Sequence, residues 1–327
     1  MFTYEDGLLL TRARLWVDVR RRQARSFVSH AHADHMARHQ LALCTPETGR
    51  LYQARLGGPG RGRLPVQEMR LGEAVDHGGL RLTALGAGHC LGSAMLLADD
   101  GERSLLYTGD FKLGESLTAA PCEPRHADWL VMESTFGRPE YRLPPRREVI
   151  ERLLEVVHEA FAAGRTPVIH AYALGKSQEV TKILTTHGVP VLQHPVVWEM
   201  SRVYEACGVT LATGDADVAR YEGRPLQGHA VVTLPKGMKN HRVAGLGPVT
   251  SIAVTGWAAG KAPYRLAVDH ALPLSDHADF TELLEFVERV EPSRVLCTHG
   301  PRSFVDELCS RGWNAEPLAP EPQGRLF

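Results

Sequence analysis

The hydrophobic positions of the chain fall into two patterns. Up to about residue 135, short apolar runs alternate with glycine-rich turns, which predicts a mostly β region whose strands follow one another in a meander. A helix should interrupt this region, because Thr45 can cap a helix and Pro46 suits its first turn. The expected strands lie at residues 15–17, 25–28, 80–85, 94–98 and 104–107.

Beyond Pro144 and Pro145, apolar residues recur at helical spacing and alternate with strand-length runs. Strands that alternate with helices over short links are typical of a parallel sheet. The expected helices cover residues 146–164, 177–187 and 196–207, and the expected strands 167–170, 189–193, 229–234 and 249–255. A helix at 280–290 and a strand at 295–298 follow. The change of pattern predicts two domains, which suits a chain of 327 residues.

Composition excludes several classes of protein. Hydrophobic residues make up 43% and charged residues 23% of the chain, which are globular values and exclude a disordered or coiled-coil protein. The 37 basic and 38 acidic residues leave a net charge of -1, so the whole chain is not a polybasic coat for nucleic acid. The 6 cysteines include no C-x-x-C pair, which argues against a thiolate zinc module.

Two further features concern the location of the protein. Apolar runs stay well short of the ~20 residues that are needed to cross a bilayer. The first residues also lack the basic segment of a signal peptide. We therefore expect a cytoplasmic protein without membrane contact.

The densest polar feature is the stretch His30–His35, which reads His-Ala-His-Ala-Asp-His after an apolar strand. In extended backbone, residues two apart point to the same side, so His30, His32 and Asp34 are expected to converge. His35 can join them if the chain turns into a helix there. Imidazole and carboxylate groups are ligands for Zn2+ and related metals, so this stretch predicts a metal site.

Three single residues extend this prediction. His89, Asp110 and His299 each follow an apolar strand and stand beside glycine. Each of them alone is compatible with an ordinary loop residue. Together with the first stretch, they supply enough ligands for a second metal ion.

The order of these motifs resembles the metallo-β-lactamase fold. Within that fold, Met132–Gly137 (MESTFG) and Ser275–Asp279 (SDHAD) are similar to motifs of the β-CASP nuclease branch. The resemblance implies an α/β protein, with an αββα sandwich formed by residues 1–143 and 262–327. It also implies a small β-CASP domain, a parallel-sheet α/β unit, inserted at residues 144–261.

The resemblance also implies roles for single residues. It implies two divalent metal ions, Zn2+ or Mn2+, as cofactors, and a catalytic role for Asp34 beside its role as a ligand. His277 would be the general acid that protonates the leaving oxygen, and Glu133 would orient it. The first ion would be held by His30, His32, His89 and Asp110, and the second by Asp34, His35, Asp110 and His299.

A segment of the insert, His170–Glu179, resembles the part of β-CASP proteins that approaches the nucleic-acid backbone. A helix N-terminus binds phosphate through its free N–H groups, and Lys176 adds a positive charge. Substrate binding is therefore expected from His170, Tyr172, Lys176 and Ser177. The alternative for Lys176 is an ordinary solvated lysine.

The compact chain is most similar to the bacterial ligase-associated DNA exonucleases. This implies a DNA exonuclease that acts on single-stranded DNA from the 5′ end in repair, in association with a DNA ligase and a helicase. The alternative is an RNA-processing nuclease, because the family associates a late histidine such as His299 more with RNA. A small-molecule metallo-hydrolase is disfavoured because it would not need Glu133 and His277. An inactive scaffold is disfavoured because no ligand is missing.

Overall fold

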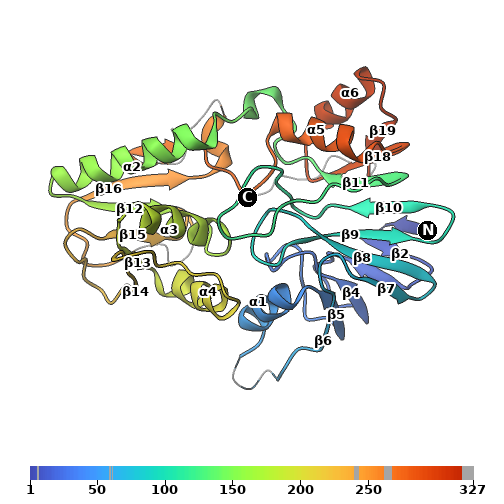
Figure 1. The fold of residues 1–327 in the computed structure, drawn as a ribbon, viewed down its shortest axis with the longest axis horizontal. Helices are drawn as coiled ribbons and strands as arrows, with labels where there is room; N and C mark the ends of the chain where they lie inside the picture. The colour runs from blue at the N-terminus through green and yellow to red at the C-terminus, as the bar shows by residue number, and fades with distance from the viewer. Residues whose placement is uncertain (6, 59, 61, 239–242, 261–266, 319–327) are drawn as a thin grey trace. The chain divides into compact units, whose positions relative to one another are not determined.

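The computed structural model describes residues 1–318 apart from 6, 59, 61, 239–242 and 261–266. The chain divides into two compact units (Figure 1). Unit 1 comprises Met1–Pro139 together with His277–Phe327, and unit 2 is Glu140–Asp276. Within the described residues, no helix is long and apolar enough to cross a membrane.

Unit 1 contains two sheets. In spatial order the first consists of β1 (Phe2–Tyr4), β2 (Leu8–Leu10), β3 (Leu15–Val17), β4 (Arg25–Phe27), β5 (Leu41–Cys44) and β6 (Val66–Glu68). The second consists of β19 (Ala315–Pro317), β18 (Arg294–Thr298), β11 (Trp129–Glu133), β10 (Ser104–Tyr107), β9 (Ala94–Asp99), β8 (Leu80–Gly86) and β7 (Ala74–His77).

Helices cover both outer faces of this pair of sheets (Figure 1). Helix α1 (Pro46–Leu56) packs on β5 and β6 of the first sheet. Helices α5 (Phe280–Val290) and α6 (Arg302–Ser310) pack on the second sheet. The helix predicted from Thr45 and Pro46 is confirmed, since the Thr45 side chain accepts the N–H of Thr48. The unit is the αββα sandwich that the sequence implied.

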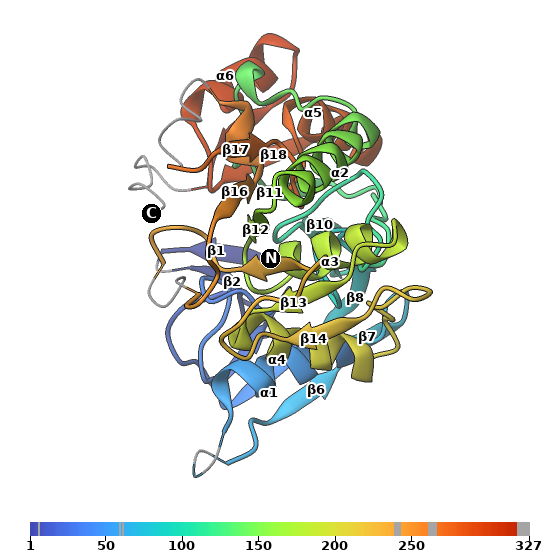
Figure 2. The same cartoon turned by 90° about the vertical axis from the view of Figure 1, so that its left-hand side faces the viewer.

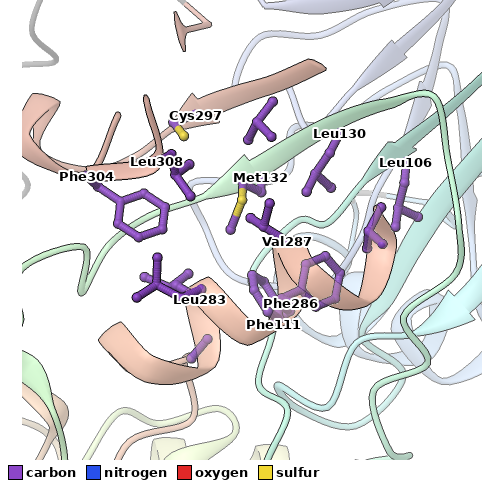
Figure 3. Packing of buried hydrophobic residues seen from close by; sticks show 14 of the residues in the cluster. Leu106, Phe111, Leu130, Met132, Leu283, Phe286, Val287, Cys297, Phe304 and Leu308 are labelled. Carbon is purple, nitrogen blue, oxygen red and sulfur yellow. The ribbon is translucent and has the colours of Figure 1, made fainter. Parts of the chain in front are cut away.

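The alternation of side chains along the second sheet explains this layering. Successive residues of a strand point to opposite faces, so Val131 of β11 packs between the two sheets whereas Leu130 and Met132 face α5 and α6. Figure 3 shows Leu130 and Met132 near Phe286 and Val287 of α5. Burial of such side chains contributes about 1.5–3 kcal/mol each, so both faces of β11 help to hold the layers together.

The expected meander is correct for only part of each sheet, because β1 to β3 are antiparallel neighbours in the first sheet and β10 pairs in parallel with β11 in the second. Strands β8, β9 and β10 are antiparallel neighbours, as a meander requires. Strands β3 to β6, by contrast, are parallel. Parallel neighbours need a crossover between them, and here the histidine stretch links β4 to β5 while α1 links β5 to β6.

Unit 2 has one sheet in which every pairing between its strands is parallel, as the strand–helix alternation predicted. Its strands lie in the order β14 (Val218–Arg220), β13 (Val191–Gln193), β15 (Ala230–Thr233), β12 (Thr166–His170), β16 (Val249–Val254) and β17 (His270–Leu272). Figure 2 shows β14, β13, β12, β16 and β17 in this succession. The helices of the unit are α2 (Arg146–Ala162), α3 (Lys176–Thr186) and α4 (Pro195–Ala206), with short 3-10 turns at η1 (Pro139–Tyr141) and η2 (Gly256–Ala259).

The two faces of this sheet are covered differently. All three helices contribute buried residues to the cluster on one face, where Ile169 of β12 lies. On the other face, the neighbouring Val168 packs with Leu192, Val231 and Tyr221. The inner strands β12, β13, β15 and β16 are therefore buried on both sides, which explains why they read as apolar runs in the sequence.

The change from one unit to the other does not fall where the sequence analysis put the domain boundaries. We expected the insert to cover residues 144–261, whereas the compact unit runs from Glu140 to Asp276. The later end has a local cause, because β17 pairs in parallel with β16 and so belongs to the sheet of unit 2. The short sequence of β17 gave no strand signal.

Candidate metal centre

The chemically active side chains of unit 1 lie at the ends of strands that run in one direction. Asp18 follows β3, and the histidine stretch follows β4, its parallel neighbour. In the second sheet, Asp110 follows β10, Glu133 ends β11 and His299 follows β18, and these three strands are also parallel. Because the carboxyl ends of parallel strands meet at one edge of a sheet, residues far apart in sequence are brought together.

Four ligand atoms form the tightest cluster. They belong to His30, His32, His89 and Asp110, and all lie within 4.8 Å of one another. His32 Nδ1 is 3.0 Å from His30 Nε2 and 3.1 Å from His89 Nε2. Asp110 Oδ2 is 3.4 Å from His30 Nε2 and 3.9 Å from His89 Nε2.

These separations fit a tetrahedral metal site. Zinc–nitrogen bonds of about 2.0–2.1 Å in a tetrahedron place neighbouring ligand atoms roughly 3.3 Å apart. The four distances lie on both sides of that value, and three imidazoles with one carboxylate are a donor set that Zn2+ accepts. This set of residues is the one that the sequence analysis expected for the first ion.

The residues expected to hold the second ion lie farther apart and are more exposed than those of the first set. His35 Nε2 lies 3.3 Å from Asp110 Oδ2 and 3.9 Å from Asp34 Oδ2, so Asp110 stands between the two sets. The rings of His35 and His299 have their centroids 5.8 Å apart. The structure thus brings the residues of both predicted sets to one place. The Asp34 side chain is the most exposed of the carboxylates there, at 46%.

The backbone around His35 differs from the expectation. His35 does not begin a helix; the chain makes a turn at Ala33 and Asp34, and the N–H of His35 donates to the carbonyl of His32. A turn of this kind places His32 and His35 on the same side of the chain. It therefore achieves the convergence that we had expected from a helix.

Asp18 is a functional candidate that the sequence analysis missed. Its carboxylate accepts hydrogen bonds from the Ser29 N–H, the Ser29 hydroxyl and the Tyr107 hydroxyl, and His35 Nδ1 lies 2.8 Å from it. An anchored Nδ1 leaves Nε2 of His35 directed at Asp110 and Asp34, which is how carboxylates orient metal-binding imidazoles. The signal available in the sequence was its position after the strand at 15–17.

Burial and neighbouring charge set the protonation states in the cluster. Burial and the nearby His35 lower the pKa of His30 well below its ordinary value. Burial also disfavours charge on His35, but the carboxylates of Asp110 and Asp18 raise its pKa well above the usual range. Burial opposes ionisation of Asp110, yet His35 and His277 hold its pKa well below normal. Asp110 is therefore ionised and His30 neutral, the forms that bind a cation.

His277 and Glu133 form a separate pair beside these ligands. Glu133, which is 1% exposed, lies with its two carboxylate oxygens 2.9 and 3.1 Å from His277 Nδ1. The same carboxylate accepts the N–H of Phe111 at 3.0 Å. The other ring nitrogen, Nε2, lies 3.9 Å from Asp110 Oδ2. The ring is thus held at Nδ1 while Nε2 faces the carboxylate that joins the two metal sets.

Two glycines allow the loops of the centre to approach each other. Gly88, beside His89, has a φ of 76°, and a Cβ there would lie 2.1 Å from the carbonyl oxygen of Lys112. A Cβ on Gly300, beside His299, would lie 2.1 Å from the carbonyl oxygen of Ser134. His299 itself has a φ of 53°, a conformation that a non-glycine residue adopts only when its surroundings hold it.

The four residues predicted to bind substrate belong to unit 2, and the structure places them differently from one another. Tyr172 is 48% exposed. His170 Nδ1 lies 2.9 Å from the carbonyl of Leu234, and the Ser177 hydroxyl donates to the carbonyl of Ala171. Lys176 is only 1% exposed, so it is not the solvated lysine of the alternative interpretation. The polar groups of His170 and Ser177 are therefore bonded within the protein, and Lys176 forms an ion pair with Asp276.

Comparison with known families identifies the last part of the chain. The family model of the Zn-dependent metallo-hydrolase RNA specificity domain matches residues 262–316. A crystal structure of a protein of unknown function from Enterococcus faecalis aligns with a TM-score of 0.58 and 15% identity, over 85% of this chain and 75% of that one. This likeness concerns the fold alone.

Three relatives extend the comparison to the whole chain. A probable DNA ligase of Opitutus terrae is 39% identical over 99% of this chain and 31% of its own length. The 5′ exonuclease Apollo of Gallus gallus is 28% identical over 83% of this chain and 57% of its own. Cleavage and polyadenylation specificity factor subunit 3 of Dictyostelium discoideum is 24% identical over 74% of this chain and 38% of its own. The chain thus spans less than two thirds of each of these relatives.

The fold, the metal-binding motifs and these relatives agree. The chain is similar to the β-CASP nucleases of the metallo-β-lactamase fold. The clusters of histidine and aspartate among the described residues are compatible with two divalent metal ions.

Proposed function

We propose that this protein is a metal-dependent nuclease that hydrolyses the phosphodiester bonds of single-stranded DNA from the 5′ end. The observation that carries the proposal is the position of His277 Nε2, which faces Asp110 while Nδ1 is held by Glu133. A small-molecule hydrolase that only needs a metal-activated water has no use for a proton donor fixed in this way.

The residues have separate tasks in the proposed reaction. When bound, two divalent ions supply a nucleophile at neutral pH and balance the charge that develops on the phosphate. His30, His32, His89 and Asp110 would hold one ion, and Asp34, His35, Asp110 and His299 the other. Asp34 also faces solvent, where an incoming phosphate arrives.

The leaving oxygen of a phosphodiester is a poor leaving group and needs a proton. His277 donates this proton from Nε2, and Glu133 stabilises the charged imidazolium by accepting from Nδ1. Phe111 fixes Glu133 in turn through its backbone N–H. The chain thus supplies a proton donor whose orientation is set before the substrate arrives.

The name of one relative favours DNA, and the name of another favours attack at a 5′ end. Apollo is named a 5′ exonuclease, and the relative from Opitutus terrae is named a probable DNA ligase. From these names we propose a role in DNA end processing together with a DNA ligase. The family resemblance adds a helicase as a proposed partner, and the sequence features add the cytoplasm as the proposed location. Tyr172 is proposed to contact the single strand, because an exposed aromatic ring can stack on a base.

RNA is the second candidate, and a specific observation favours it. The family model that matches residues 262–316 is named for RNA specificity, and this range contains His299. The relative from Dictyostelium discoideum is named a cleavage and polyadenylation factor. An RNA nuclease would use the same metal centre and the same proton donor.

One assay tests the proposal. The protein is incubated with end-labelled single-stranded DNA and RNA of equal sequence, with Zn2+ or Mn2+ in turn. We expect a ladder of DNA products that shortens from the 5′ end and a slower reaction with RNA. Faster cleavage of RNA would favour the second candidate, and a metal-loaded protein that cuts neither would refute the nuclease function.

A further inference from the structure

We propose that Lys176 is a positioning residue that acts on His277 through an ion pair with Asp276, the residue before it in the chain. The proposal deepens the proposed function, because it rests on His277 as the proton donor. It also changes the role of Lys176, which the sequence pattern had assigned to binding phosphate.

The ion pair lies inside unit 2. Lys176 Nζ is 3.2 Å from Asp276 Oδ1, and the two side chains are 1% and 14% exposed. A buried ammonium group is strongly unfavourable unless a nearby carboxylate compensates its charge. Lys176 is therefore committed to Asp276, and a phosphate would have to break this pair before it could use the charge.

The lysine is carried by a helix that is itself firmly held. It is the first residue of α3, whose Gln178 accepts the Gly175 N–H at 2.9 Å and donates to the Ala173 carbonyl at 3.0 Å. Glu179 in the same turn pairs with Arg146 of α2. These contacts hold the first turn of α3 in place. Lys176 can therefore fix the position of Asp276.

The segment that leads to His277 is anchored on both sides of this residue. Before it, Leu272 and Leu274 are buried in the core of unit 2, and the Leu274 N–H donates to the Leu272 carbonyl. After it, the Ala278 N–H donates to the Phe111 carbonyl at 2.6 Å, and Asp279 caps α5. The ion pair of Asp276 is thus a polar anchor next to the backbone of His277.

The consequence concerns the direction of Nε2. Glu133 holds the imidazole at one atom, but the ring also follows the backbone that carries it. If Asp276 is released, the backbone of His277 gains freedom and Nε2 departs from the line of the leaving oxygen. A misplacement of about 1 Å can cost on the order of 100-fold in rate.

The test uses Lys176→Met, which keeps the length of the side chain and removes its charge. Asp276→Asn and the double variant Lys176→Met/Asp276→Asn complete a cycle. Lys182→Met is the matched control, because Lys182 lies on the same helix and its Nζ bonds to Thr213 instead. Thermal unfolding and metal content are measured for each variant.

We expect kcat on single-stranded DNA to fall about 100-fold in Lys176→Met, as for a proton donor that is misplaced, with KM and DNA affinity unchanged. Asp276→Asn should show the same fall, and the double variant should be no worse than either. Lys182→Met should match the wild type. If the losses of the two single variants multiply in the double variant, Lys176 does not act through Asp276.

A substrate with a better leaving group distinguishes the positioning of His277 from a structural or phosphate-binding role of Lys176. DNA with sulfur in place of the departing bridging oxygen releases a thiolate, which needs no proton donor because the pKa of a thiol is only about 8.5. On this substrate, Lys176→Met and His277→Ala should recover most of the lost rate. Equal losses on both substrates, or a higher KM in Lys176→Met, would mean that Lys176 serves the structure or binds phosphate.

A readout without catalysis completes the test. In protein labelled with 15N-histidine, the signals of the His277 ring are assigned from their absence in His277→Ala. They should shift in Lys176→Met and Asp276→Asn but not in Lys182→Met. Unshifted signals in the two variants would overturn the proposal even if the wild type is an active nuclease. A wild type without nuclease activity would instead refute the proposed function.

Discussion

Two polar regions of the molecule were predicted to be functional, and they are built differently. In unit 1, the loops after β3, β4, β8, β10 and β18 turn their imidazoles and carboxylates toward one another. In unit 2, the N-terminus of α3 has polar residues that are hydrogen-bonded or paired within the protein, such as Ser177 and Lys176. Both regions follow the carboxyl ends of strands, yet only the first presents several ligand atoms to one point.

The two regions differ in how their polar groups are compensated. In the first region, buried ligand atoms lie only 3.0–3.9 Å apart. Holding imidazole and carboxylate groups this close away from water costs free energy, and a bound cation offsets that cost. A lysine paired with an aspartate is already compensated and needs no ligand. The first region therefore predicts a bound metal, and the second predicts a support for the chain.

The largest effect on nuclease activity is expected from removal of the carboxylate that lies between the two ligand sets. Asp110→Ala should abolish hydrolysis of nucleic acid, because Asp110 Oδ2 lies within 3.4 Å of both His30 and His35. Loss of metal-ion stabilisation is worth several kcal/mol. Nuclease rates, elemental analysis and circular dichroism check this prediction. Asp76→Ala, at an exposed position of β7, is the control, and full activity in Asp110→Ala would defeat the metal assignment.

The next largest effect separates proton donation from metal binding. His277→Ala should slow cleavage by about 100- to 10,000-fold, the range for general acid catalysis. Its metal content should stay that of the wild type, because His277 Nδ1 is bound to Glu133. Activity assays combined with elemental analysis decide between the roles. A variant that loses metal would show that His277 is a ligand.

The sequence predicted contacts between neighbouring residues better than contacts between residues far apart in the chain. His30–His35 is a local motif, so its convergence follows from strand geometry and a turn. The meeting of Asp110 with this stretch depends on two sheets that stack. Its position after an apolar strand and beside glycine suggested this meeting, and the family resemblance gave its place in both ligand sets. The role of Asp18 and the parallel arrangement of β3 to β6 depend on pairings that periodicity does not contain.

The α3 region was harder to predict for a physical reason. A lysine at a helix N-terminus has the same local sequence whether it binds phosphate or a carboxylate of the protein. Asp276 is 100 positions away from Lys176 in numbering, and no spacing rule connects them. Burial decides between the two roles, and burial is a property of the folded chain.

A smaller effect concerns the support of the metal ligands. Asp18→Asn should weaken metal binding about 10- to 100-fold, as expected when a carboxylate that orients a metal-binding histidine is lost. The cause is the hydrogen bond at His35 Nδ1, which fixes the direction of Nε2. Titration of the metal-free protein with Zn2+ measures the affinity. Tyr107→Phe removes one donor to the same carboxylate and should have a milder effect; an Asp18→Asn variant with wild-type affinity would refute the supporting role.

The smallest effect is expected at the exposed residue of the α3 region. Tyr172→Ala should weaken binding of single-stranded DNA about 10-fold, because stacking of a base on an aromatic ring is worth about 1–3 kcal/mol. Tyr172→Phe keeps the ring and should bind like the wild type. Fluorescence anisotropy with labelled oligonucleotides measures both affinities at one salt concentration. If Tyr172→Ala binds normally while Lys176→Met binds poorly, the buried lysine rather than the exposed tyrosine contacts the strand.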